Sequence, residues 1–254
     1  MKTNKIDVLD HGFVRLVSYM QPVPHYVDES FMNADLVERD SGWTGDLEIV
    51  RNARVSYDAD WRTGEDEGAD TRIINFMMEH GHNTPFEAMV FTFEIKCPIF
   101  IRSQWHRHRT WSYNEISARY SELPEEYYIP SYQVMTTQDR KNKQSRTEVQ
   151  IQNVGWHQGN MVAHMRQSFQ LYHELLEAGL ARELARSVLP MATYTRYFGT
   201  VDLHNLFHFI RERVNPGAQW EMRQYAHALL ELISPIVPIA VDAFRKTLHK
   251  PTGA

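Results

Sequence analysis

Residues 107–120 read RHRTWSYNEISARY, and this stretch combines cations and hydrogen-bonding groups with aromatic side chains. Two closely spaced arginines, Arg107 and Arg109, can each hold phosphate or carboxylate oxygens bidentately. Polar groups set between aromatic walls are typical of a pocket for a planar, phosphorylated ligand. The stretch therefore indicates a nucleotide or cofactor phosphate site. The alternative is a solvated surface stripe, the usual meaning of a run of charges.

The composition is that of a globular protein with a substantial core. The chain has 254 residues, of which 43% are hydrophobic and 23% charged, and its formal net charge is −5. An acidic protein of this kind is not expected to bind nucleic acid or an anionic membrane, and no apolar run is long enough to span a bilayer. The N-terminal residues are interrupted by charges, unlike a secretory signal. Cys97 is the single cysteine, so the chain has no internal disulfide framework. A reducing compartment, the cytoplasm, is therefore expected.

Periodicity in the N-terminal half predicts strands and helices in alternation. Residues 6–20 indicate two short strands around a turn at 10–12, and strict alternation over 89–97 predicts a strand with one buried face. Helices are expected over 46–56 and 70–80, the second ending at Gly81. Pro98 suits the first turn of a further helix, expected to carry Ile101, Gln104, Trp105 and His108.

The remaining segments divide into polar loops and amphipathic helices. Residues 21–45 and 58–70 are predicted to be loops, and residues 136–158 a mobile loop. Three apolar stripes at helical spacing follow: Met161, Met165, Phe169, Tyr172 and Leu176; Leu203, Leu206, Phe207 and Ile210; and Met222, Tyr225, Ala226, Leu229 and Ile233. We expect one α+β domain over residues 1–254, with a mixed or antiparallel sheet and several long helices.

The stretch at 107–120 also resembles the signature of flavin-dependent thymidylate synthases, in which Arg-His-Arg is followed after seven residues by a serine. Arg107, His108, Arg109 and Ser117 occupy those positions. The resemblance extends to GHNTPFEAMVFTF at 81–93, ARSVLPMATYTRY at 185–197 and RERVNPGAQWEMRQYA at 211–226. It implies reductive methylation of dUMP to dTMP, with FAD as cofactor, NADPH as its reductant and methylenetetrahydrofolate as carbon donor.

The resemblance also implies roles for individual residues. Arg213 is expected to be catalytic, by favouring the anionic form of the uracil ring. The dUMP site is expected to contain Gln104, Trp105, His106, Arg107, Glu115, Ile116, Ser117, Ala118, Arg119, Arg186 and Arg213. The FAD site is expected to contain Thr84, Arg107, His108, Arg109, Glu115, Asp202, Leu203, His204 and His208. The family further implies a homotetramer whose active sites are shared between subunits.

Two positions depart from the family pattern. Asp202 stands where several members have asparagine, and a carboxylate cannot donate a hydrogen bond as an amide does. Asp202 is also well placed to cap the helix predicted after it, so that role can replace a flavin contact. His204 stands where some relatives have arginine. A histidine can be neutral where an arginine is always cationic, so the charge at this position is not determined by the resemblance.

Several of these residues also allow other interpretations. His204 and His208 have the spacing of a metal pair, but no HExxH pattern surrounds them and no metal site is expected. Ser117 lacks the G-x-S-x-G setting of a nucleophile, which favours phosphate binding. Cys97 fits a buried strand position better than a reactive thiolate. Two rival functions remain, a non-catalytic nucleotide-binding module and a metal-dependent nucleotide hydrolase.

Overall fold

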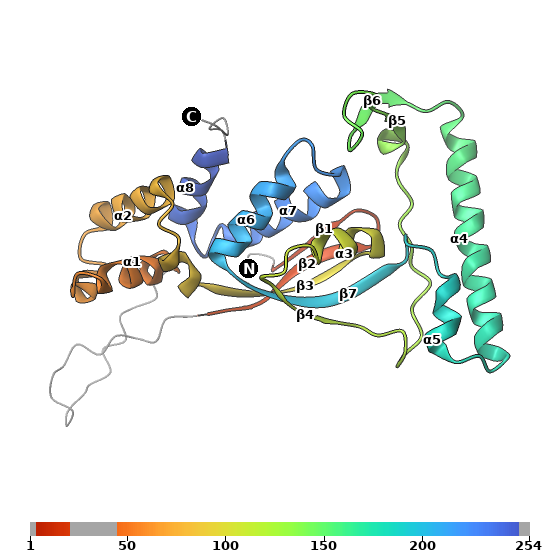
Figure 1. Cartoon of the computed structure of the whole chain (residues 1–254), viewed down its shortest axis with the longest axis horizontal. Helices are drawn as coiled ribbons and strands as arrows, with labels where there is room; N and C mark the ends of the chain where they lie inside the picture. Colours follow the sequence, from red (N-terminus) through yellow and green to blue (C-terminus); the bar gives the residue numbers. More distant parts are fainter. Residues whose placement is uncertain (1–3, 21–44, 249–254) are drawn as a thin grey trace.

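The computed structural model describes residues 4–20 and 45–248, which form an antiparallel sheet with helices around it (Figure 1). The strands are β1 (Lys5–Val8), β2 (Gly12–Tyr19), β3 (Val90–Pro98), β4 (Ser112–Glu115), β5 (Thr136–Gln138), β6 (Arg146–Gln150) and β7 (Tyr194–Asp202). The helices are α1 (Gly45–Val55), α2 (Glu67–His80), α3 (Ile99–Trp105), α4 (Val154–Glu177), α5 (Arg182–Ala185), α6 (Leu203–Val214), α7 (Trp220–Ile233) and α8 (Pro238–Leu248). The α+β class predicted from the sequence is confirmed.

The main sheet has five strands in the order β1-β2-β3-β7-β4, and every pair is antiparallel. In β3 the predicted alternation holds, because Phe91, Phe93, Ile95 and Cys97 are all fully buried. The opposite face also buries Glu94, whose carboxylate pairs with Arg15 and Arg196 at 3.1 Å each. The sheet therefore has a thick apolar core on one face and a band of ion pairs on the other.

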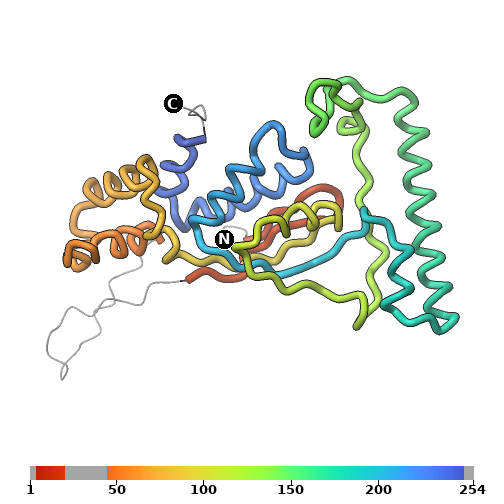
Figure 2. The backbone as a smooth tube through the Cα atoms, viewed as in Figure 1, coloured from red at the N-terminus to blue at the C-terminus, as the bar shows by residue number. Residues whose placement is uncertain are grey.

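Helices α6 and α7 cover the apolar face of the sheet, and α1, α2 and α8 pack at one end of it (Figure 2). The predicted stripes of α6 and α7 are buried, as periodicity requires. The side chain of Asp202 caps α6 by accepting a hydrogen bond from the Asn205 amide at 2.9 Å. Gly81 ends α2 in the left-handed region at φ 70°, where residues with a Cβ are strained.

Helix α4 stands apart from this core at the other end of the molecule (Figure 1). Of its predicted stripe only Phe169 and Tyr172 are fully buried, and they form a small separate cluster with Ala185. The long helix is thus supported by few apolar contacts within the chain. No helix among residues 4–20 and 45–248 is both long and apolar enough to cross a membrane.

Several expectations about local structure were wrong. Helix α2 begins inside the predicted loop 58–70, because Asp66 caps it by accepting from the Ala69 amide. Helix α3 ends at Trp105, so His108 lies beyond it. Most of the predicted loop 21–45 lies outside the described residues.

The predicted mobile loop 136–158 contains the hairpin β5–β6 and the start of α4. It was not recognised because this small sheet buries no apolar face from which alternation could be read. Strands β4 and β7 were not predicted as strands either. The mobility of the segment stays a prediction.

Gly12 lies where β2 passes closest to α7, and replacing it with alanine is expected to destabilise the protein. A Cβ there would lie 2.1 Å from the Tyr225 hydroxyl and within 2.8 Å of the carbonyl oxygens of Val8 and Lys96. Overpacking of this kind costs about 1–3 kcal/mol. Denaturant unfolding should show this loss of free energy of unfolding for Gly12→Ala.

Gly159, within α4, provides the matched control. Among the described residues, nothing beyond its chain neighbours and the adjacent helix backbone lies within 4 Å of a Cβ at this position. Gly159→Ala should leave stability unchanged or raise it by about 0.5–1 kcal/mol, the helix preference of alanine over glycine. Equal losses for the two variants would contradict the close packing described at Gly12.

Candidate functional site

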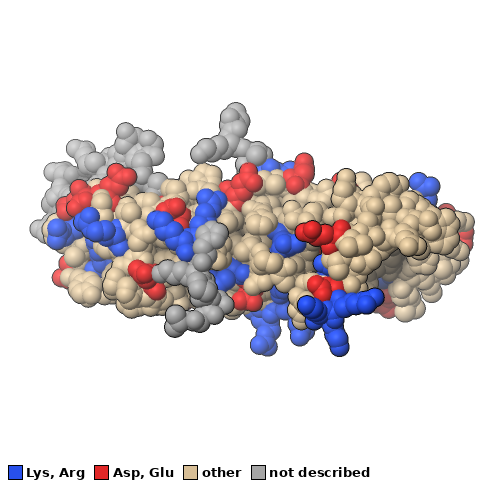
Figure 3. Space-filling model, turned by 90° about the horizontal axis from the view of Figure 1, so that it is seen from above, with Lys and Arg blue, Asp and Glu red and all other residues tan. Residues whose placement is uncertain are grey.

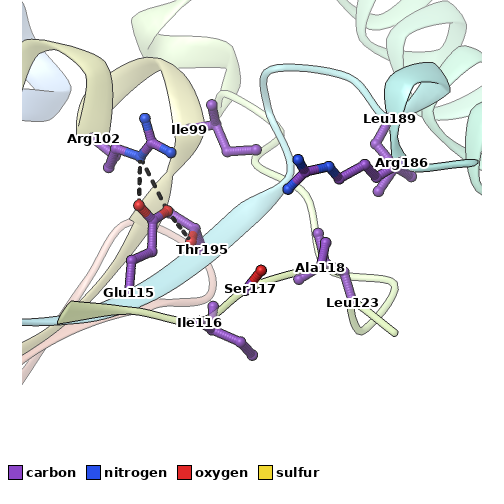
Figure 4. A pocket seen from close by; sticks show the side chains of 10 residues that line it. All are labelled: Ile99, Arg102, Glu115, Ile116, Ser117, Ala118, Leu123, Arg186, Leu189 and Thr195. Atoms are coloured by element: carbon purple, nitrogen blue, oxygen red, sulfur yellow. Dashed lines mark hydrogen bonds and ion pairs between the residues drawn. The ribbon is translucent and has the colours of Figure 1, made fainter. Parts of the chain in front are cut away.

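A cavity of about 320 Å³ opens between the main sheet and the segment around α5 (Figure 4). Strand β4 ends at Glu115 beside β7, and the chain then continues along the cavity wall. Five of the predicted dUMP residues line it: Glu115, Ile116, Ser117, Ala118 and Arg186. Ile99, Arg102, Leu123, Leu189 and Thr195 complete the lining. The structure therefore brings together predicted residues that are as far apart in the sequence as Glu115 and Arg186, which are separated by 71 positions.

The carboxylate of Glu115 is held firmly in this cavity. Its Oε1 accepts a hydrogen bond from Arg102 Nε at 3.0 Å and another from the Thr195 hydroxyl at 2.6 Å. Arg102 Nε also lies 3.0 Å from Oε2. Thr195 is buried, whereas the side chains of Arg102 and Glu115 remain partly exposed.

Two cations border the cavity, Arg102 and Arg186. The guanidinium of Arg186 extends into the space opposite Glu115, and Ser117 lies on the wall between them (Figure 4). A hydroxyl and two guanidinium groups are suitable ligands for a phosphate. Arg119, also predicted for this site, does not line the cavity and lies 3.6 Å from Glu183.

A second cluster forms around Arg213, in the last turn of α6. Arg213 Nε donates to His108 Nε2 at 3.0 Å, and its Nη2 lies 3.5 Å from the backbone oxygen of Gln104. The side-chain amide of Gln104 donates to Gln219, the residue before α7. The predicted residues Gln104, His108 and Arg213 are therefore in direct contact.

His108 is held neutral in this cluster. Burial lowers the pKa of His108 to about 4, assisted by the positive charge of Arg213 and by His208. A neutral imidazole can accept the hydrogen bond from Arg213 at Nε2, which a protonated ring cannot. Burial also lowers the pKa of His106, as does the charge of Arg102.

The stability of the protein should therefore fall as the pH drops from 6.5 towards 4. In this window the unfolded chain protonates the His108 imidazole while the folded chain does not, so protons favour unfolding. His108→Asn, which cannot titrate, should show a flatter profile of free energy of unfolding against pH. Denaturant titrations at several pH values measure this, and parallel profiles for the two proteins would contradict the assignment.

Residues predicted to bind FAD are distributed over three regions, one of which is the smaller cavity with Glu115. Thr84, at the start of a short 3-10 helix (Thr84–Ala88), lines a cavity of about 830 Å³ with Arg54, Tyr57, Arg72 and Phe76 among its walls. This cavity is large enough for an extended cofactor and offers both aromatic faces and cations. Arg54, one of its lining residues, has a buried Nη1 with no hydrogen-bond partner among the described residues.

The other predicted FAD residues lie around α6 and the loop after α3. Asp202 accepts hydrogen bonds from Asn205 on both oxygens, at 2.9 and 2.6 Å, so its carboxylate serves the helix cap. His204 is partly buried and His208 exposed on the same helix. Residues 4–20 and 45–248 contain no group of three His, Cys, Asp or Glu side chains placed to hold a metal.

Trp105 and Leu203 are fully buried in the main core, where Trp105 packs against Phe209 with ring centroids 4.7 Å apart. Neither side chain lines the 320 Å³ cavity or the 830 Å³ cavity. Arg107 and Arg109, in contrast, are exposed.

Basic and acidic side chains alternate over the molecular face in Figure 3, with a group of Lys and Arg side chains projecting from one edge. The surface therefore carries local positive charge despite the negative net charge.

Five lining residues of the smaller cavity were missed by sequence reasoning: Ile99, Arg102, Leu123, Leu189 and Thr195. Arg102 could have been found from the sequence, because it begins the run of basic residues that includes Arg107 and Arg109. Thr195 could not, because it reaches the cavity only through the pairing of β7 with β3 and β4.

Comparison with known proteins bears on this site. The family described as thymidylate synthase complementing protein matches residues 39–239. The chain is 41% identical over 243 residues to a flavin-dependent thymidylate synthase of Thermus thermophilus, covering 96% of this chain and 79% of the relative. It is 39% identical over 247 residues to one of Thermotoga neapolitana, covering 97% and 96%.

A solved structure has the same fold. The chain resembles the UMP/dUMP methylase PolB of Streptomyces cacaoi, bound with 5-Br dUMP, with a TM-score of 0.78 and 26% sequence identity. The match covers 95% of this chain and 97% of that one. The likeness thus spans the sheet, the two clusters and both cavities.

Proposed function

The chain belongs to the family of flavin-dependent thymidylate synthases and is a methyltransferase acting on dUMP; from this premise we propose how its residues serve the reaction. The carbon donor is 5,10-methylenetetrahydrofolate, and NADPH-reduced FAD supplies the hydride. The observation that carries the proposal is the cavity formed by Glu115, Ile116, Ser117, Ala118 and Arg186, the predicted nucleotide residues.

In this proposal the smaller cavity takes dUMP. Ser117 and Arg186 bind its phosphate, and Glu115, Ile116 and Ala118 line the nucleotide. Arg119 lies outside this lining and would reach the phosphate only by leaving Glu183. Gln104, His106 and Arg107 extend the site towards the base, and the buried Trp105 side chain supports them from the core. Arg213 stabilises negative charge on the uracil ring, an electrostatic role that needs no nucleophile. Neutral His108 orients Arg213 through the 3.0 Å hydrogen bond.

FAD fits the residues that the chain offers. The larger cavity beside Thr84 provides volume, aromatic walls and the unpartnered Nη1 of Arg54, and the exposed Arg107 and Arg109 can bind phosphates. Further contacts would come from His108, Glu115, His204 and His208, and from the backbone at Asp202 and Leu203, whose side chains cap α6 and pack in the core. When bound, the flavin supplies hydride chemistry, while the protein positions the reactants and excludes water.

The visible absorption spectrum of the purified chain tests the proposal. Bound flavin absorbs blue light, and addition of NADPH should bleach it. Adding dUMP and methylenetetrahydrofolate should then yield dTMP. A nucleotide-binding module or a metal-dependent hydrolase would be colourless, so a colourless chain that forms no dTMP with added FAD would overturn the proposal.

We also propose a homotetramer with shared active sites, located in the cytoplasm. The support is the face of the sheet that carries Glu94 and exposed Phe198, which no helix covers in Figure 1, together with the sparsely packed α4. Closed symmetric assemblies commonly bury such surfaces. Mixing inactive Arg213→Ala and His204→Ala proteins should restore partial activity after subunit exchange, and no activity despite confirmed exchange would count against shared sites.

Cys97→Ala is expected to retain dUMP methylation. The thiol is fully buried, it donates to the Tyr197 hydroxyl at 3.9 Å, and burial strongly raises its pKa, so no thiolate is available to attack the pyrimidine. The loss should be confined to roughly 1 kcal/mol of stability. Turnover assays on the folded, FAD-loaded variant measure this, and a dead enzyme would place a sulfur nucleophile in the mechanism.

A further inference from the structure

Resting on the proposed function, we infer that Arg102 and Thr195 are positioning residues that hold Glu115 for nucleotide binding and balance its charge beside the phosphate. Neither residue belongs to the predicted site, yet both line the cavity. Both donate hydrogen bonds to Glu115, and they reach it from different elements, α3 and β7 (Figure 4). These hydrogen bonds fix the position of the Glu115 carboxylate before the nucleotide enters the cavity.

The geometry leaves one carboxylate oxygen available. Oε1 accepts from both Arg102 and Thr195, whereas Oε2 has only the shared contact with Arg102 Nε at 3.0 Å. A carboxylate has acceptor sites for about four donors. Oε2 therefore retains capacity for a donor of the bound nucleotide, and the two fixed donors on Oε1 determine where Oε2 points.

The charges explain why an arginine is needed. The cavity carries two cations, Arg102 and Arg186, and one carboxylate, Glu115. A carboxylate left unpaired near a bound phosphate would repel it, and the repulsion is strong where water is partly excluded. Pairing with Arg102 cancels this charge and leaves the positive charge of Arg186 to attract the phosphate.

The role of Thr195 rests on a buried hydroxyl. Its Oγ1 donates to Glu115 at 2.6 Å from a residue that is 5% exposed, so removal of the hydroxyl would leave Oε1 short of a donor. Thr193 offers a matched comparison, because it is fully buried near the start of the same strand but its Oγ1 has no hydrogen-bond partner among the described residues.

Calorimetric binding of dUMP to the FAD-loaded protein tests the role of Thr195. Thr195→Val should raise the Kd for dUMP by about 10-fold, the scale of losing a charge-assisted hydrogen bond. Thr195→Ser, which keeps the hydroxyl, should restore tight binding, and Thr193→Val should bind dUMP like the wild type. Unchanged binding by Thr195→Val, or equal losses for both valine variants, would overturn the positioning role.

A charge cycle tests Arg102 independently of Thr195. Arg102→Met should weaken binding of dUMP by about 10-fold or more but that of deoxyuridine much less, because deoxyuridine lacks the phosphate. Adding Glu115→Gln to Arg102→Met removes the unpaired carboxylate, and should return the preference for dUMP over deoxyuridine towards its wild-type value. A purely structural arginine would weaken both ligands equally and show no such recovery.

The proposed function and this inference fail in different ways. A wild-type chain that forms no dTMP when supplied with flavin, NADPH and the folate overturns the proposed function. A wild-type chain that forms dTMP, with Arg102→Met and Thr195→Val binding dUMP normally and keeping the wild-type KM, overturns the inference alone.

Discussion

Replacement of Arg213 by alanine is expected to lower the rate of dTMP formation by about 100-fold or more, while the fold and FAD binding persist. The loss of a preorganised electrostatic stabiliser typically has an effect of this size. Arg213 is partly buried at the end of α6, and burial lowers the pKa of its guanidinium. Its hydrogen bond to His108 fixes its direction, so the charge is placed before substrate binds.

Arg211→Ala serves as the control for this experiment. Arg211 lies two residues earlier on α6, is exposed, and donates to the Thr247 hydroxyl at 3.1 Å, away from the cluster around Arg213. Its replacement should leave kcat unchanged. Single-turnover assays of both variants, with flavin content measured by absorbance, separate chemistry from cofactor loss. Near-normal turnover in Arg213→Ala would remove this residue from the mechanism.

Arg186→Ala should weaken dUMP binding by about 10- to 150-fold, equivalent to ~1.5–3 kcal/mol for a hydrogen bond to a charged group. The guanidinium extends into the proposed nucleotide cavity, and its one hydrogen bond to the described residues is a long contact of 3.4 Å with the Glu183 carbonyl. The arginine is therefore free to bind an anion. Deoxyuridine, without the phosphate, should bind the variant and the wild type about equally.

Arg182→Ala is the matched control for Arg186→Ala. Arg182 begins α5, four residues before Arg186, and lies 3.9 Å from Glu122 without lining the cavity. Its loss should leave the Kd for dUMP unchanged. An equal loss of deoxyuridine binding in Arg186→Ala would show that this arginine supports the structure or contacts the base.

The sequence was informative where structure is encoded locally. The stripes of α6 and α7, the cap at Asp202 and the helix end at Gly81 follow from spacings of three or four residues, and each is confirmed. Helix α4 shows the limit of this reasoning. Its stripe predicted a helix correctly, but the apolar face is only partly buried because few other elements reach it within the chain.

The site was harder to predict because its parts meet only through tertiary structure. Glu115 pairs with Tyr197 across β4 and β7, and this register brings the Thr195 hydroxyl to the carboxylate from 80 residues away. No spacing in the chain encodes that contact. The family resemblance supplied Glu115 and Arg186, but Arg102 and Thr195 needed the sheet to be known.

The unequal size of the two apolar clusters has a consequence for hydrogen exchange. The main cluster unites the sheet with six helices, α1, α2, α3, α6, α7 and α8, whereas the second rests on Phe169, Tyr172 and Ala185. Regions with few buried contacts open at lower free energy than the rest of a protein. Backbone amides of α4 should therefore exchange with deuterated solvent well before those of β3 in the isolated chain. The proposed nucleotide cavity is lined from both parts, by Thr195 on one side and Leu189 on the other, so bound dUMP should slow exchange in the smaller unit.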